Sequence, residues 1–155
     1  MHPGFPDLAS PPTGWTVSRA GAAIRLVPPG AYPDRARACM VISPLVPVSP
    51  AMPNIETVIR QALSAEVLGT GMTVESESEI QDVQTEGALK GKRLVLAVRH
   101  KGASEIQRRV YTMYRDASWL YGIHYISDEA TFDFFLPTYE STAQSVLAVP
   151  PPEPG

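Results

Sequence analysis

The sequence predicts an α+β fold in which helices pack on an antiparallel sheet, as an α/β/α sandwich. Short apolar runs bounded by glycine and proline open the chain, and two segments carry apolar residues at helical spacing. Between those two segments lie four longer strand-like runs joined by short polar turns, and such tight connections require antiparallel pairing. With 155 residues, 44% of them hydrophobic and 19% charged, the chain is long and apolar enough for one folded domain.

The first third of the chain predicts three strands and a crossing loop. Residues 15–17 and 22–27 are predicted strands separated by a turn at Gly21, and residues 36–42 are a third candidate strand. A proline then recurs at about every third position between Pro44 and Pro53. Because proline lacks a backbone donor and fixes φ, this stretch predicts a stiff loop rather than a helix or a central strand.

A helix of about four turns follows. Asn54 is placed as its N-cap, and Gly69 is placed as its C′ residue. Apolar side chains recur between them at helical spacing: Ile55, Val58, Ile59, Ala62, Leu63 and Val67.

The four longer strands are predicted over residues 72–84, 89–99, 105–115 and 118–127. Asp116 and Ala117 connect the last two as a hairpin. The closing segment, 128–147, has helical apolar spacing that Pro137 interrupts, so it is either a kinked helix or a helix that starts afresh near Pro137.

The two ends are predicted to lie outside the domain. Half of the 16 prolines fall there, which divides the chain into a tail at 1–13, a single α+β domain at 14–149 and a second tail at 150–155. The start lacks an export signal, no apolar run approaches the ~20 residues of a membrane span, and Cys39 has no disulfide partner. We therefore expect a cytoplasmic protein.

Several segments resemble the superfamily that groups the photosystem protein PsbP, the Ran-binding Mog protein and the bacterial lipoprotein DcrB. The resemblance rests on element order and apolar spacing across residues 14–148, and it is carried by Gly14-Trp15, Leu26-Val27-Pro28, Ala38–Ile42, Asn54–Leu68, Trp119–Ser127 and Phe135–Leu147. Within that superfamily the layout is similar to the small chaperones encoded beside type VI secretion effectors. The resemblance implies a sandwich used mainly for binding, in which an open sheet face holds the apolar helices of a client.

No motif in the chain indicates catalysis. The segment from Gly87 to Arg93 has three residues between its glycines and no Ser or Thr after the lysine, so it does not match a phosphate-binding loop. His2, His100 and His124 share no metal-ligand spacing, and apolar neighbours surround Cys39. We therefore predict no enzyme activity, no metal and no cofactor, with His124 at the core or its rim, hydrogen-bonded to a partner and able to respond to pH.

Charge is separated along the middle of the chain. Glu75, Glu77 and Glu79 alternate along one predicted strand and would share a face, whereas arginines at positions 93, 99, 108 and 109 follow on the next strands. Pairing of oppositely charged strands is the structural interpretation. The functional alternatives are an acidic edge that docks a basic partner, such as a small GTPase, or arginines that hold an anion or small molecule. A formal net charge of −3 and the lack of a ribonucleoprotein signature predict no nucleic-acid partner.

The last two strands are apolar on both faces, although an antiparallel sheet needs only one dry face. Either the two helices lie on opposite faces, or part of one face is left for a partner. The second alternative predicts a partner-binding surface composed of Tyr111, Met113, Trp119, Tyr121, Ile123 and Tyr125. Our expectation is thus a non-catalytic domain that binds another protein, most concretely a chaperone or adaptor for a secreted effector, with a homodimer left open.

Overall fold

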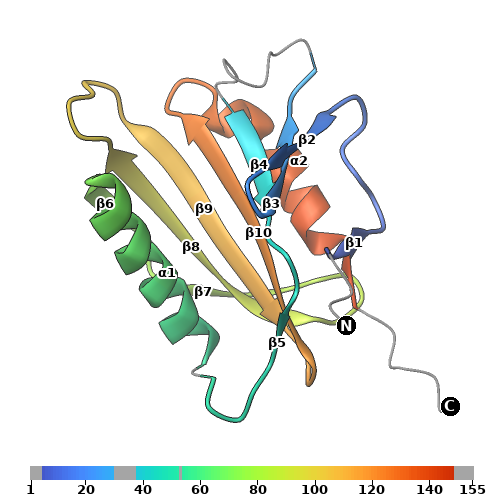
Figure 1. Ribbon diagram of the computed structural model, residues 1–155. Helices are drawn as coiled ribbons and strands as arrows, with labels where there is room; N and C mark the ends of the chain where they lie inside the picture. Colours follow the sequence, from blue (N-terminus) through green and yellow to red (C-terminus); the bar gives the residue numbers. More distant parts are fainter. Residues whose placement is uncertain (1–4, 30–37, 53, 149–155) are drawn as a thin grey trace, which may run out of the picture.

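The computed structural model describes residues 5–29, 38–52 and 54–148. One large sheet dominates it, with strand order β2-β3-β4-β10-β9-β8-β6 and antiparallel pairing throughout (Figure 1). The short strands β5 and β7 extend the sheet beside β10 and β8. The bounds are β2 Thr16–Ala20, β3 Ala23–Val27, β4 Ala38–Ile42, β5 Val46–Pro47, β6 Thr73–Glu77, β7 Gln81–Gln84, β8 Lys90–Arg99, β9 Gln107–Arg115 and β10 Trp119–Asp128.

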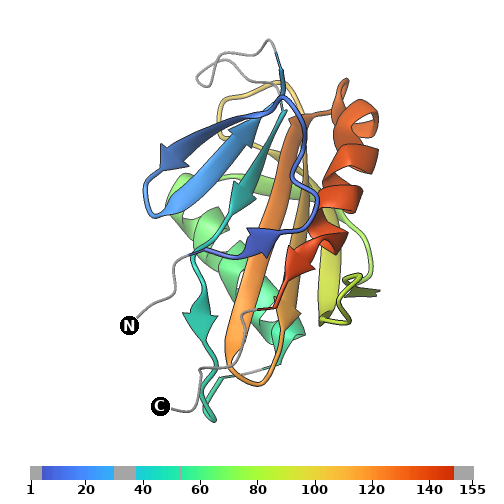
Figure 2. The same ribbon diagram turned by 90° about the vertical axis from the view of Figure 1, so that its right-hand side faces the viewer.

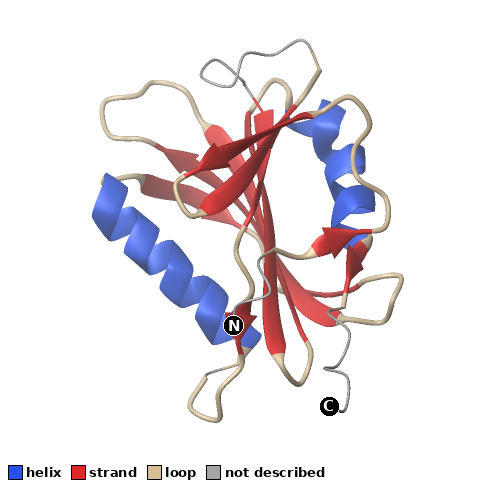
Figure 3. Cartoon of the chain, turned by 45° about the vertical axis from the view of Figure 1, so that its right-hand side comes forward, coloured by secondary structure: helices blue, strands red, loops and turns tan. Residues whose placement is uncertain are grey.

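Two helices lie on opposite faces of this sheet. Helix α1, Ile55–Thr70, packs on β8 and β9, and helix α2, Phe132–Gln144, packs on β10 and β4 from the other side (Figure 3). The predicted α+β class and the antiparallel sheet between helices are confirmed. The apolar character of both faces of β9 and β10 therefore has a structural cause, since each face supports one helix.

Helix α1 begins as predicted and ends later. The Asn54 Oδ1 accepts a hydrogen bond from the Thr57 N–H at 2.9 Å, which caps the first turn. The left-handed residue that ends the helix is Gly71, with φ 72°, so the prediction of Gly69 is wrong by one half-turn. The Thr70 hydroxyl donates to the Glu66 carbonyl at 2.7 Å within the last turn, and the Gly71 N–H then bonds the Val67 carbonyl.

Two elements of the structure differ from the prediction in whether they are continuous. The segment 72–84 is two strands, β6 and β7, because the register shifts between Val74 and Ser76 and the chain leaves the strand before Glu79. Helix α2 runs through Pro137, which lies inside it, so a fresh helix start at that proline is wrong. The exposed side of the helix accommodates the proline ring.

The chain joins the fold before the predicted boundary at residue 14. Strand β1, Asp7–Leu8, pairs with strand β11, Val146–Leu147, as a separate two-stranded sheet (Figure 2). The Ala9 N–H also donates to the Ser145 carbonyl at 2.8 Å. The predicted tail 1–13 is therefore wrong from Phe5 onward, whereas residues 150–155 lie outside the described residues.

The core is divided by the sheet into two clusters. Beneath α1, Ile59 and Leu63 pack on Leu94, Leu96 and Val98. Beneath α2 the cluster is aromatic: the ring of Tyr125 stacks with the rings of Tyr139 and Phe132, each at 5.3 Å between centroids. The Tyr139 hydroxyl donates to the Ile123 carbonyl at 2.8 Å, which satisfies the polar end of a buried ring. Neither helix of the described chain has the length and apolar character to cross a membrane.

Candidate functional site: a groove beside helix α1

The predicted partner-binding surface is buried by the chain itself. Five of its six residues are at most 9% exposed, and the sixth, Trp119, is half-buried. Tyr111 and Met113 lie beneath α1, whereas Tyr121, Ile123 and Tyr125 lie beneath α2. The prediction of an open sheet face at these residues is wrong, because segments assigned to the tail and first strand also pack there: Phe5, Leu8 and Trp15.

A groove remains where the crossing loop passes α1. It has a volume of about 430 Å³ and lies between residues 43–52 and the first two turns of the helix. Its lining includes Val46 and Met52 from the loop, Val58 from α1, and Met113 and Leu120 from the sheet. Val46 is 43% exposed, so the groove opens to solvent with an apolar wall. Proline keeps this loop extended, and a short pairing of β5 with β10 fixes it at one end.

Gly122 of β10 also lines the groove. A Cβ atom there would lie 3.4 Å from the His124 Nε2 and from the Ser43 side chain, so the glycine keeps the space between β10 and the loop free. The His124 ring lies next along β10, in edge contact with the Tyr111 ring at 5.1 Å. Its Nδ1 atom is buried without a hydrogen-bond partner, so the predicted partner is not found at that nitrogen.

A polar network lies beneath the C-terminal half of α1. The Arg109 side chain is 5% exposed and pairs with Glu66 of the helix, and the Tyr111 hydroxyl donates to the same carboxylate. The Arg109 Nε donates to the Gln107 Oε1 at 2.8 Å, and its Nη2 lies 3.3 Å from the His100 Nε2. The guanidinium is thus surrounded by acceptors within the chain, which ties α1 to β9.

The electrostatics follow from burial and from this pairing. Burial alone would raise the pKa of Glu66, but hydrogen bonds from Tyr111 and Arg109 outweigh it and lower the pKa. Burial, together with the hydrogen bond to Glu66, raises the pKa of Tyr111 to about 12. Burial also lowers the pKa of His124 to about 4; the Glu66 carboxylate opposes this shift, and the charge of Arg109 adds a smaller lowering. His124 is therefore a neutral imidazole at pH 7.

The acidic edge is neutralised by arginines. Glu75 pairs with Arg99 at 2.9 Å and Glu77 pairs with Arg60 at 3.1 Å, whereas Glu79 lies exposed beyond the end of β6. The structural interpretation, in which acidic and basic segments meet across strands, is confirmed for Glu75 and Arg99. The prediction that all three glutamates share one face of a strand is wrong, because β6 ends at Glu77, before Glu79.

The other predicted arginines are also engaged within the chain. Arg93 donates to Glu140 at 2.9 Å and to Gln81 at 3.0 Å. The guanidinium carbon of Arg108 lies 4.7 Å from the centre of the Phe132 ring. The contacts of Arg93 commit two of its nitrogens to partners within the chain, whereas the Nε atoms of Arg93 and Arg108 have no hydrogen-bond partner among the described residues.

Metal-binding geometry is not found in the described part of the chain. No group of three or more histidine, cysteine, aspartate or glutamate side chains there could hold a metal ion. Cys39 is buried, and burial raises the pKa of its thiol despite the nearby Arg25. Since a protonated, buried thiol is a poor nucleophile, the residue acts as a small core side chain.

Sequence reasoning missed Glu66 and Gly122. Glu66 lies on the polar side of a predicted helix, and only tertiary packing places it over Arg109. Gly122 interrupts an aromatic strand, and a glycine within a strand is a known signal of close approach by another segment. That signal could have located the crossing loop against β10.

Comparison with known proteins identifies the fold but no function. No protein-family model matches the sequence, and curated proteins yield no significant match. CyanoP, the cyanobacterial PsbP of Synechocystis sp. PCC 6803, superposes with a TM-score of 0.62 at 10% sequence identity, over 90% of this chain and 84% of CyanoP. The fold is PsbP-like. PA94 of Pseudomonas aeruginosa, a protein of unknown function described as a candidate regulator, matches with a TM-score of 0.52 at 16% identity, over 88% of this chain and 99% of PA94.

Proposed function

We propose that this protein is a non-catalytic binding domain that holds an apolar helix of another protein in the groove beside α1. The observation that carries the proposal is a solvent-accessible groove with apolar walls, in a fold where the polar pair beneath α1, Arg109 and Glu66, is already formed within the chain. Methionine lines both sides of the groove, through Met52 and Met113, and its flexible side chain adapts to differently shaped partners. Apolar helices bind grooves of this kind through a few anchoring side chains.

The finer proposal is a chaperone or adaptor for a secreted effector, as the resemblance to the type VI secretion chaperones implies. In those proteins a sheet face holds the client, whereas here helix α1 and the crossing loop border a narrower contact of about 430 Å³. The groove would receive anchoring side chains of the client and leave most of its helix on the outer surface. The proposed partner is therefore a protein with an exposed apolar helix.

Binding of a defined helix tests the general proposal. The probe is a fluorescently labelled, 20-residue Leu/Ala helical peptide, followed by anisotropy. Val46→Asp places a charge in the groove wall and should weaken binding at least about tenfold, because desolvating an unpaired carboxylate costs more than the 1.4 kcal/mol that this factor represents. Leu147→Asp is the matched control, since Val46 and Leu147 are both 43% exposed and only Val46 lines the groove. Equal effects of the two variants, or no binding by the wild-type protein, would contradict the proposal.

Cross-linking in cells tests the finer proposal. A photo-reactive residue at Gln61, which is exposed at the groove, should capture a protein with an apolar helix, whereas the same residue at Phe134, on α2, should not. Mass spectrometry of the captured product should identify a secreted effector. A soluble signalling protein captured at Gln61 would favour the adaptor alternative instead.

A further inference from the structure

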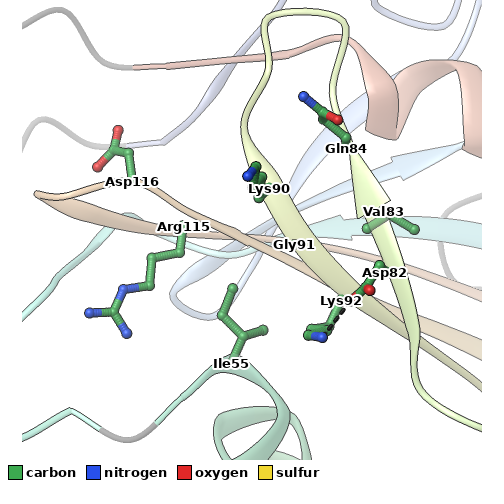
Figure 4. A pocket seen from close by; sticks show the side chains of 9 residues that line it. All are labelled: Ile55, Asp82, Val83, Gln84, Lys90, Gly91, Lys92, Arg115 and Asp116. Atoms are coloured by element: carbon green, nitrogen blue, oxygen red, sulfur yellow. Dashed lines mark hydrogen bonds and ion pairs between the residues drawn. The ribbon is translucent and has the colours of Figure 1, made fainter.

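A second cavity lies where the β7, β8 and β9 strands end beside the start of α1. Its volume is about 710 Å³, and it shares no lining residue with the groove beside α1 (Figure 4). Three cationic side chains line it: Lys90 and Lys92 from β8, and Arg115 from β9. Since the proposed function uses none of these residues, any role of this cavity is separate from it.

The strand register brings two of these cations together. Lys90 lies directly opposite Arg115 in the β8–β9 pair, and Lys92, two residues on, projects to the same face. Like charges at directly opposed positions of an antiparallel pair repel one another. In Figure 4 the Arg115 side chain lies on the side of the sheet where Ile55 begins α1, whereas Lys92 turns toward Asp82.

Both carboxylates in the wall are already engaged. Asp82 pairs with Lys92. Asp116 accepts hydrogen bonds from the Tyr121 hydroxyl at 2.6 Å and from the N–H groups of Ser118 and Trp119 at 2.7 Å each. Within the described residues, no ion pair or hydrogen bond neutralises Lys90 or Arg115. Lys90 and Arg115 therefore have no ion pair of their own in the described chain, whereas Asp116 keeps its negative charge in the wall because its hydrogen bonds outweigh the effect of burial and lower its pKa.

Other groups around the cavity determine what it could accept. The positive end of the α1 dipole begins at Ile55 and adds to the field of the two cations, although Glu56 in the first turn partly offsets it near Lys92. Ile55 and Val83 supply apolar wall. A volume of about 710 Å³ is in the range of small-molecule sites, so an anion carrying an apolar group would fit.

We propose that this cavity binds the phosphate group of a small phosphorylated molecule between Lys90 and Arg115. Arginine can donate two parallel hydrogen bonds to phosphate oxygens, and lysine adds a point charge on the opposite side. The bound anion would also relieve the repulsion between the two cations. The site differs from the predicted arginine site, whose side chains are engaged elsewhere in the chain.

The test is a titration of the full chain with phenyl phosphate, followed by amide NMR at low ionic strength. The expected result is a saturable shift of the Gly91 and Ile55 amides. Lys90→Gln and Arg115→Gln should each weaken binding about tenfold, because the free energy of one hydrogen bond to a charged group corresponds to about that factor in affinity. Lys101→Gln removes the same charge from an exposed turn away from the cavity and should leave binding unchanged.

Three results would overturn the proposal. Equal weakening by Lys90→Gln and Lys101→Gln would show that phenyl phosphate responds only to net charge. Shifts spread over many surface amides would show nonspecific association, and a lack of shifts at Gly91 would exclude the site.

Arg115→Lys keeps the charge and the strand but removes the bidentate donor, so it should bind more weakly than wild type and more tightly than Arg115→Gln. The groove variant Val46→Asp should bind phenyl phosphate normally, which separates failure of this site from failure of the proposed function.

Discussion

The half-buried imidazole of His124, whose Nδ1 is enclosed by the chain, makes a specific prediction about stability and pH. Its Nδ1 has no hydrogen-bond partner, and burial lowers its pKa from 6.5 to about 4. The unfolded chain, with a histidine pKa near 6.5, binds the proton more readily than the folded chain. Stability from this residue is therefore complete above pH 6.5 and is lost as the pH falls toward 4.

The size of this loss follows from the two pKa values. A pKa lowered from 6.5 to about 4 corresponds to roughly 3 kcal/mol, at 1.36 kcal/mol per pKa unit. About 2 kcal/mol of it should already be lost at pH 5. The protein also loses the stabilisation from ionised Glu66 in acid, because the pKa of Glu66 is lower in the folded chain. This loss begins only as the pH falls below the ordinary glutamate pKa near 4.5. The interval from pH 7 to pH 5 therefore isolates the histidine.

Urea unfolding at pH 7, 6 and 5 provides the measurement. The free energy of unfolding should fall by about 2 kcal/mol across this interval in the wild-type protein, and by much less in His124→Gln, which cannot titrate. The comparison uses the change with pH in each protein, because the variant also loses ring contact with Tyr111. An equal change in both proteins, or an NMR titration of the His124 ring with a midpoint near 6.5, would refute the reasoning.

Two further predictions concern packing and charge, and both are measured by urea unfolding at pH 7. Glu66→Ala removes the ion-pair partner of the buried Arg109 guanidinium and should lower the free energy of unfolding by about 3 kcal/mol, the low end for a broken buried pair because the Glu66 side chain is 34% exposed. The control Glu77→Ala breaks an exposed pair and should lower it by under about 1 kcal/mol. Similar losses in the two variants would contradict the burial assigned to the Arg109 pair. Gly91→Ala would place a Cβ atom 2.1 Å from a backbone carbonyl of β9 and should cost about 1–3 kcal/mol or more, whereas Gly69→Ala, with nothing within 4 Å, should stabilise α1 by about 0.5–1 kcal/mol. A neutral Gly91→Ala would show that the two strands lie further apart than described.

Local signals in the sequence were sufficient for most elements. Asn54 marks the start of α1 because an N-cap needs only its own side chain and an amide three residues on. The end of the helix was less certain because Gly69 and Gly71 can both adopt positive φ. The choice depends on Thr70, whose hydroxyl bonds within the last turn. Strand pairing through Asp116 was equally predictable, since the turn and its flanking strands are adjacent in sequence.

The site was less predictable because it depends on distant contacts. The proline content suggested a tail at residues 1–13, so Phe5 and Leu8 were not counted as cover for the sheet. That error made the aromatic strands seem to exceed what two helices could bury. The partners Glu66 and Arg109 are separated by 43 positions, and nothing near either residue indicates the other. Local patterns thus identified the strands but not which of their side chains reach solvent.

The clasp between β1 and β11 has a mechanical consequence. Asp7 is the partner of Leu147, and Leu8 is the partner of Val146, so both outer ends of this pair leave from the same side. Tension applied through the two ends would unzip the clasp one residue pair at a time, before any load reached the large sheet. A tethered copy of this domain would thus lengthen at low force while its helices and its groove stayed intact.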